Sequence, residues 1–243
     1  DLGALTVLTR GLPFGSSTPV IDAEARKARD QAGSNAWTVA GSRTASGRPI
    51  LANDPHLGIG GFSPRHVAHL TAPGLDVIGG GAPGLPGIMQ GHTDRFAFGR
   101  TNFHIDQADL YILDLDPADP EHYRHDGGWK RFDRHEAVVR IAGAPDRVET
   151  LRYSVHGPVI SHDPARHRAS AVATISMQPG ASGWFAMIAI NLAQDWQSLK
   201  PAFALHPSPT NFHYADVDGN TGWQVIGFAP VRKRGDGLFP VPG

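Results

Sequence analysis

The sequence predicts an α+β protein in which short strands outnumber helices. Short apolar runs fenced by Gly or Pro recur along the chain, and this pattern is typical of strands. The 29 glycines and 20 prolines supply the turns between them. Two later stretches look helical, because residues 184–192 are continuous good helix formers and residues 196–205 carry an apolar stripe. Strands, then helices, then further strands favour packed α+β layers.

The first expected element is a hairpin. Its arms, residues 37–40 and 50–53, are apolar and flank a turn rich in Ser, Gly and Arg. The last two expected strands are joined by Asp218-Gly219-Asn220, a strong turn signal. The other strands are expected at residues 67–71, 75–78, 95–99, 110–115, 137–141, 148–155, 212–215 and 223–228.

Charge and composition exclude several classes of protein. The chain has 243 residues, with 22 Lys and Arg against 23 Asp and Glu and no basic block, which argues against a nucleic-acid partner. No apolar run is long enough to be a membrane span. The absence of Cys removes cysteine nucleophiles, disulfides and cysteine-based zinc sites.

The chain divides into a linker-like segment and a domain. Residues 1–33 have loop composition and include a charged stretch, 22–31, that is expected to be a solvated helix. Residues 34–243 form the expected domain. The chain begins with Asp1 and stops abruptly at Gly243, so we expect an incomplete piece of a longer polypeptide.

Gly33-Ser34-Asn35 stands directly before the first apolar run. One interpretation is a turn, because Gly and Asn tolerate left-handed dihedrals and Ser and Asn bond to nearby backbone. The other is a peptide bond meant to be cut, which would make Ser34 a new first residue. These residues by themselves favour the turn.

Two pairs of histidines raise the question of a metal site. The members of each pair lie three residues apart, but neither pair has the His-Glu-x-x-His pattern that supplies a catalytic base beside a metal. A structural or surface role is favoured, and a metal hydrolase stays an alternative. The pairs are His66 with His69 and His122 with His125.

Asp106, Asp109, Asp114 and Asp116 cluster around the start of an expected strand. Hard oxygen ligands at this spacing can hold calcium, although carboxylates at loop edges are more often only solvated.

Asn211 lies at the beginning of another expected strand. A side-chain amide at a strand end is a suitable oxyanion donor.

A series of motifs in order resembles the penicillin acylase family of N-terminal nucleophile (Ntn) hydrolases, and the resemblance runs from Gly33 to Gly243. It reverses the preference for a turn at Ser34. The motifs are GSNAW at 33–37, ANDPHL at 52–57, PGLPG at 83–87, GHTDRFAFG at 91–99, HGPV at 156–159, residues 211–220 and PVPG at 240–243. The resemblance implies a four-layer αββα sandwich with two antiparallel sheets face to face and helices outside.

The resemblance also implies a mechanism. The precursor cuts itself between Gly33 and Ser34, and Ser34 then carries both the nucleophilic hydroxyl and a free α-amino group. That amine has a reference pKa of about 8 and serves as the base that the hydroxyl needs.

By the same resemblance, four other residues complete the catalytic set. The Asn211 side chain and the Asn102 backbone N–H stabilise the oxyanion, and the His56 backbone helps to hold the Ser34 amine and the substrate. Arg232 organises Asn211 and the new amino terminus.

Substrate and cofactor expectations follow from the resemblance too. Leu57 and Gln90 occupy acyl-pocket positions that are usually aromatic in phenylacetyl-preferring members, and Arg100 beside them either meets a carboxylate or faces solvent. A structural calcium is expected, and no organic cofactor. The calcium ligands are expected to be Asp106, the Ala108 backbone and Asp109. A further acidic ligand is expected from the family's other subunit, which comes from the same precursor.

The resemblance therefore implies a self-processing amidohydrolase for penicillin-like or N-acyl amides, exported to the periplasm or secreted. An alternative within the family is an acylase for N-acyl-homoserine lactones or lipopeptides. An alternative of another class is an uncut, non-catalytic binding domain on the same scaffold.

Overall fold

The computed structural model describes residues 33–57, 64–233 and 235–243. The expected helix at 22–31 and most of the linker-like segment 1–33 lie outside these residues. The described chain forms two compact units. We call residues 33–107 and 178–230 the Ser34 unit, and residues 108–177 and 231–243 the Asp109 unit.

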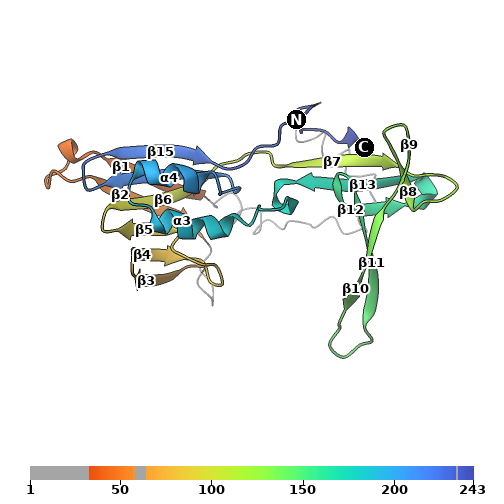
Figure 1. Ribbon diagram of the computed structural model, residues 1–243, viewed down its shortest axis with the longest axis horizontal. Coiled ribbons are helices and arrows are strands. Elements are labelled where there is room, and N and C mark those ends of the chain that lie inside the picture. Colours follow the sequence, from red (N-terminus) through yellow and green to blue (C-terminus); the bar gives the residue numbers. More distant parts are fainter. Residues whose placement is uncertain (1–32, 58–63, 234) are drawn as a thin grey trace, which may run out of the picture. The chain divides into compact units, whose positions relative to one another are not determined.

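The Ser34 unit is built on a six-stranded antiparallel sheet (Figure 1). Its strands, in order across the sheet, are β15 (Thr221–Ile226), β14 (Thr210–Asp216), β6 (Phe96–Asn102), β5 (Gln90–Thr93), β4 (Leu75–Gly81) and β3 (His66–Ala72). The unit also contains the hairpin β1 (Gly33–Val39) and β2 (Ile50–His56), the helices α3 (Ala186–Leu192) and α4 (Trp196–Phe203), and the 3-10 turns Gly41–Arg43 and Gly183–Phe185.

Alternation along the strands sends large aromatic side chains to one face of this sheet. Phe98 of β6 and Phe212 of β14 are buried there, with stacked rings 6.0 Å apart. The helices α3 and α4 cover this face, and Phe203 packs on Phe212 with ring centroids 4.7 Å apart. Helix α4 begins at a capping box between Asp195 and Ser198, which satisfies backbone N–H groups of its first turn.

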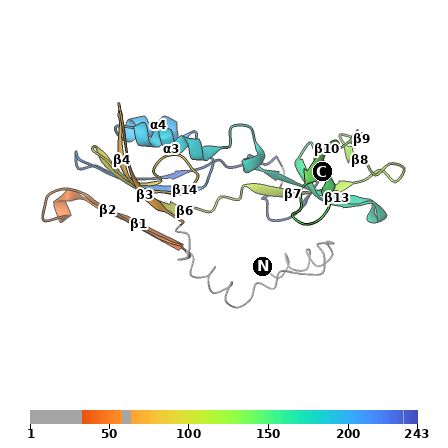
Figure 2. The same cartoon turned by 90° about the horizontal axis from the view of Figure 1, so that it is seen from below.

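The β1–β2 hairpin packs on the opposite face of the sheet, against β6 and β14. Figure 2 shows the helices on one side of the sheet and the hairpin on the other. The Ser34 unit is thus layered as helices, sheet and hairpin. The predicted α+β class is confirmed, and so are the hairpin, both helices and the Asp218-Gly219-Asn220 turn.

Asn53 of β2 joins the hairpin to the sheet. Its Nδ2 donates to the carbonyls of Asn35 (2.9 Å) and Arg100 (3.0 Å), and its Oδ1 accepts from the Arg100 N–H at 3.0 Å. Gly99 makes room for this contact, because a Cβ there would meet the Cβ of Asn53 at 2.8 Å. One amide side chain therefore binds the backbones of β1 and β6 together.

The Asp109 unit has its own sheet and core. Across the sheet the strands are β10 (Asp133–Val139), β11 (Arg147–Ser154), β12 (Gly157–Asp163), β13 (Arg168–Thr174), β7 (Ala108–Asp114) and β16 (Val241–Pro242), and the last two are parallel. A separate ribbon joins β8 (His122–His125) to β9 (Gly128–Arg131), and 3-10 turns span Pro164–Arg166 and Ile175–Met177. Leu113, Leu115, Tyr123 and Phe132 form its core.

Among the described residues, no helix combines the length and the apolar character that crossing a bilayer requires.

The substitution Gly99→Ala should destabilise the Ser34 unit. The added methyl group overlaps Asn53, so the hairpin must move away from β6, at a cost of about 1–3 kcal/mol in the free energy of unfolding. Urea denaturation measures this cost. The matched control is Gly80→Ala, where the new Cβ would lie 3.5 Å from the flexible Gln90 side chain and should be tolerated. Equal effects of the two substitutions would contradict the role given to Asn53.

Candidate active site

Ser34 lies at the start of β1, opposite Pro55 of β2. Its hydroxyl donates a hydrogen bond of 2.6 Å to the carbonyl oxygen of Gly33. The nucleophile that the sequence predicts is therefore in contact with the carbonyl of the peptide bond that it is expected to cut. Pairing with β2 holds this bond in a regular strand, not in the turn that the short motif by itself favours.

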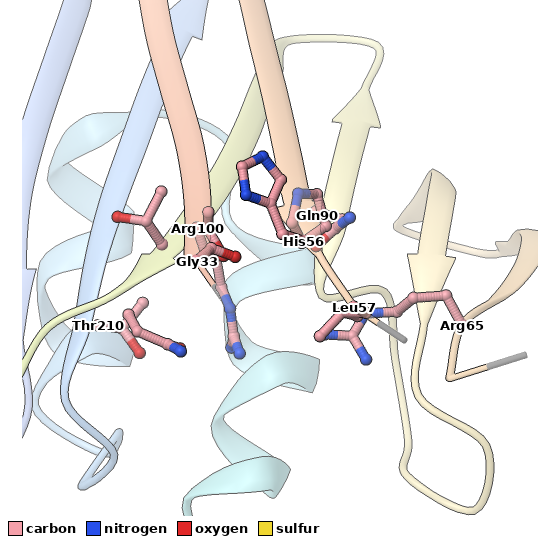
Figure 3. A pocket seen from close by; sticks show the side chains of 11 residues that line it. Gly33, His56, Leu57, Arg65, Gln90, Arg100 and Thr210 are labelled. Carbon is pink, nitrogen blue, oxygen red and sulfur yellow. The ribbon is translucent and has the colours of Figure 1, made fainter. Parts of the chain in front are cut away.

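A pocket of about 120 Å³ opens beside this bond (Figure 3). It is formed at one end of the strands by side chains that are distant in sequence. Six predicted site residues meet there: Ser34, His56, Leu57, Gln90, Arg100 and Asn102. The pocket also includes Arg65, Thr101 and Thr210, which the sequence gave no reason to choose.

Asn211 lies in β14 directly across from Thr101 of β6. Its Nδ2 donates to Thr101 Oγ1 and to the carbonyl of Asn102, both at 3.1 Å, and its Oδ1 accepts from the Trp223 indole at 3.2 Å. The amide is thus fixed next to two residues that line the pocket. Its N–H groups meet protein acceptors here, so donation to an oxyanion requires exchange of one of these bonds.

The side chain of His56 also reaches the bond at Gly33. Its Nε2 lies 3.0 Å from Asp54 Oδ2 and 3.2 Å from Asn35 Nδ2. A carboxylate can only accept, so Nε2–H donates to Asp54, and in the neutral ring Nδ1 carries the lone pair. A Cβ on Gly33 would come within 3.4 Å of Nδ1. The sequence predicted a role only for the His56 backbone.

Arg100 is partly buried, and its guanidinium reaches partners on the helix side of the sheet. Its Nη1 donates to His206 Nε2 at 3.3 Å and contacts Met187 Sδ at 3.5 Å. Burial, together with the nearby charge of Arg65, lowers the pKa of Arg100 to about 10, so the guanidinium stays charged at neutral pH. The side chain is partly buried among these partners, and the two predicted alternatives for Arg100, a carboxylate partner or solvent, stay predictions.

His206 is fully buried beside Arg100. Burial and the Arg100 charge lower the pKa of His206 to about 4, so the ring is neutral at pH 7. Its Nδ1–H donates to the Ser208 carbonyl at 3.0 Å, which leaves Nε2 to accept from Arg100. The neutral imidazole therefore accepts a hydrogen bond that orients the guanidinium, and it adds no second positive charge beside Arg100.

Arg232 lies in the Asp109 unit, whereas Ser34 and Asn211 lie in the other unit. Its Nε donates to both carboxylate oxygens of Asp109, at 2.9 and 3.0 Å. An arginine thus occupies the carboxylate that was predicted to bind calcium. The predicted role of Arg232 in organising Asn211 and the amino terminus stays a prediction.

The predicted calcium ligands fall in both units, with Asp106 in one and Ala108 and Asp109 in the other. In the described part of the chain, no three His, Asp or Glu side chains are grouped so that they could hold a metal ion. The predicted calcium set has only two of its carboxylates in this chain and takes a further acid from the other subunit, so calcium stays a prediction. The same observation gives no support to the histidine-based metal hydrolase.

Comparison with known proteins shows which family the chain belongs to. The model of the penicillin amidase family matches residues 7–243. The chain belongs to this family. It is 32% identical over 233 residues to penicillin acylase 2 proenzyme of Pseudomonas sp. (strain SE83), covering 87% of this chain and 27% of that protein.

Two further relatives of the chain are named for different substrates. Penicillin G acylase of Escherichia coli is 27% identical over 211 residues, covering 86% of this chain and 25% of that protein. An acyl-homoserine lactone acylase of Pseudomonas aeruginosa is 28% identical over 227 residues, covering 87% and 26%. The chain thus spans about a quarter of the length of these relatives.

A solved structure supports the fold. The thermostable penicillin G acylase from Alcaligenes faecalis superposes with a TM-score of 0.79, at 24% identity, covering 86% of this chain and 38% of that one. The predicted Ntn-hydrolase fold type is confirmed for the part of the fold that this chain supplies.

Stability should fall as the pH drops from about 6.5 towards 4. The pKa of His206 is lower in the folded than in the unfolded state, so the unfolded state binds more protons in this interval. The contribution of neutral His206 to the free energy of unfolding is complete above pH 6.5. It is lost as the pH falls from 6.5 to about 4. One pKa unit corresponds to about 1.4 kcal/mol, so a few kcal/mol are at stake.

Urea denaturation from pH 7 to pH 4 tests this for the wild type and for His206→Gln, which does not titrate. The difference in the free energy of unfolding between the two proteins should shrink or reverse towards pH 4. A difference that does not change with pH would show that His206 is not held neutral.

Proposed function

We propose that this chain carries the nucleophile of a self-processing acylase that hydrolyses N-acyl amides. The observation on which the proposal rests is the contact between the Ser34 hydroxyl and the Gly33 carbonyl, in a strand end that faces a pocket. Membership of the penicillin amidase family supports it, since the names of the relatives describe acylases and one is called a proenzyme.

Processing begins with attack of Ser34 Oγ on the carbonyl carbon of Gly33. The C–N bond breaks, the nitrogen of Ser34 takes a proton, and Gly33 becomes an ester on Oγ. Water then hydrolyses this ester. The products are a carboxylate at Gly33 and a chain that begins with Ser34 and has a free α-amine.

The free α-amine is the base in turnover. An amide nitrogen has no basic lone pair, whereas an α-amine with a pKa near 8 can take the proton of the Ser34 hydroxyl near neutral pH. Oγ then attacks the acyl carbonyl of the substrate, and the leaving amine receives the proton as its C–N bond breaks. Water, activated by the same amine, hydrolyses the acyl-enzyme ester.

The oxyanion of each tetrahedral intermediate needs donors. We assign this role to the Asn211 side chain and the Asn102 backbone N–H, because Asn211 is bonded to Thr101 and Asn102 at the edge of the pocket. One such donor typically lowers the barrier by about 3–4 kcal/mol. Both N–H groups of the Asn211 amide are bonded to protein acceptors, so donation to the oxyanion exchanges one of these hydrogen bonds.

The next question is which acyl group the substrate carries. Leu57 and Gln90 line the pocket and offer no aromatic ring for a phenylacetyl group to stack on. Relatives include both penicillin acylases and acyl-homoserine lactone acylases, so both substrate classes are candidates. The family resemblance further suggests a second subunit from the same precursor and export to the periplasm.

Substitution of Ser34 should abolish processing. In the longest natural polypeptide that contains this sequence, the wild type should yield a chain beginning Ser-Asn-Ala-Trp, and Ser34→Ala should stay whole and inactive. Intact mass and N-terminal sequencing give both results. The control Ser42→Ala removes an exposed hydroxyl from the same hairpin and should process normally. A folded wild type that stays whole would instead favour an uncut binding domain.

A further inference from the structure

Three side chains from neighbouring strands form a row of hydrogen bonds in the Ser34 unit. Trp223 of β15 is bonded to Asn211 of β14, and Asn211 is bonded to Thr101 of β6. Asn211 and Thr101 are paired directly across the sheet, so their side chains share one face. Phe212 faces the helices, and alternation along the strand therefore turns Asn211 and Thr101 towards the hairpin that carries Ser34.

The orientation of the Asn211 amide follows from groups with a single hydrogen-bonding role. The Trp223 indole N–H can only donate, and it lies 3.2 Å from Asn211 Oδ1. The carbonyl of Asn102 can only accept, and it lies 3.1 Å from Nδ2. A flipped amide would set N–H against N–H at Trp223 and oxygen against oxygen at Asn102. Nδ2 is therefore the atom that faces Thr101 Oγ1, also at 3.1 Å.

This orientation decides what the Thr101 hydroxyl can do. A hydroxyl has one O–H donor and two lone pairs. Because Nδ2 of Asn211 can only donate, Thr101 Oγ1 accepts there, and its own proton is left for another acceptor. Among the residues that the structure describes, none accepts this proton. Thr101 lines the same pocket as Ser34, so its O–H is available to a group that reacts there.

The partners of Thr101 also strengthen its O–H as a donor. Hydrogen bonds in a row polarise one another. The Trp223 N–H draws electron density towards Oδ1 of Asn211, and the amide N–H then does the same at Thr101 Oγ1. The Trp223 side chain is 59% exposed, so it adds little to the core, yet its one polar atom is bonded to Asn211.

We propose that Thr101 is a further catalytic residue, whose O–H donates a hydrogen bond to the oxyanion of the tetrahedral intermediate. This inference rests on the proposed acylase function and adds a donor to it. Asn211 keeps its bond to Thr101 and exchanges the one to the Asn102 carbonyl. The hydroxyl keeps its proton and only turns towards the negative oxygen, so its bond strengthens as charge develops.

Hydroxyl-deleting variants of the natural protein that contains this chain test the proposal. Thr101→Val removes the hydroxyl at nearly equal volume, and Thr101→Ser keeps it. Thr101→Ala is a second variant without the hydroxyl, in case the valine is not accommodated. Circular dichroism confirms folding. The probe is 4-nitrophenyl butyrate, with hydrolysis by Ser34→Ala subtracted, and the second probe is butylboronic acid, whose tetrahedral adduct with Ser34 imitates the intermediate.

Loss of the hydroxyl should lower kcat by at least about tenfold, since removal of one oxyanion donor typically costs about 10²–10³ in kcat. KM should change less than about twofold, because the bond forms with the oxyanion and not with the ground state. The affinity for butylboronic acid should fall in parallel with kcat. Thr101→Ser should stay close to the wild type. The control Thr71→Val removes an exposed hydroxyl from β3 of the same sheet and should change nothing.

Three results would overturn the proposal: an unchanged kcat in Thr101→Val, an equal loss in Thr101→Val and Thr101→Ser, or a loss confined to KM. Self-processing gives a second measure, because attack on the Gly33 carbonyl also forms an oxyanion. A folded Thr101→Val precursor that is cut more slowly than Thr101→Ser supports the hydroxyl, and equal rates of cutting count against it.

Failure of this inference differs from failure of the proposed function. If Ser34→Ala hydrolyses the ester as fast as the wild type, the acylase function falls and the role of Thr101 falls with it. If Ser34→Ala is inactive while Thr101→Val is as active as the wild type, only the role of Thr101 falls.

Discussion

The side chain of Asn53 is the contact on which the candidate site depends. Its amide binds the backbone of β1 at Asn35 and the backbone of β6 at Arg100. Ser34 is the residue before Asn35, so the position of the proposed nucleophile relative to the sheet is set within one residue of this contact. Without it, the hairpin that carries Ser34 would rest on the sheet without a polar anchor at this point, and the pocket would lose its shape.

The same contact also links Ser34 to Arg100. Arg100 is anchored through its backbone by Asn53 and through its guanidinium by His206. Burial keeps His206 neutral, so the charge of Arg100 is available at the pocket wall. The proposed nucleophile and the arginine therefore share one scaffold, and a shift of the hairpin would affect both the Ser34 hydroxyl and Arg100.

Local signals in the sequence predicted much of the fold. The hairpin at Ser34, the helices α3 and α4 and the Asp-Gly-Asn turn follow from apolar runs and turn residues. Several strands were missed, namely β5, β8, β9, β12, β13 and β16. The strand β5 has only four residues, one of them Gly, and β13 is rich in Ala, so neither carries a strong strand pattern. Partners such as Arg65, Thr101 and His206 join the site only through the folded sheet. Neither they nor the Arg232–Asp109 pair leaves a local pattern in the sequence.

The most direct test of the account is to locate the acyl group during turnover. The natural protein that contains this chain is mixed with an acyl anilide, quenched in acid within milliseconds and digested, and the peptides are weighed by mass spectrometry. The account predicts that the acyl mass is found on a peptide that begins at Ser34. An acyl group on any other residue, or on a peptide in which Gly33 and Ser34 are still joined, would contradict it.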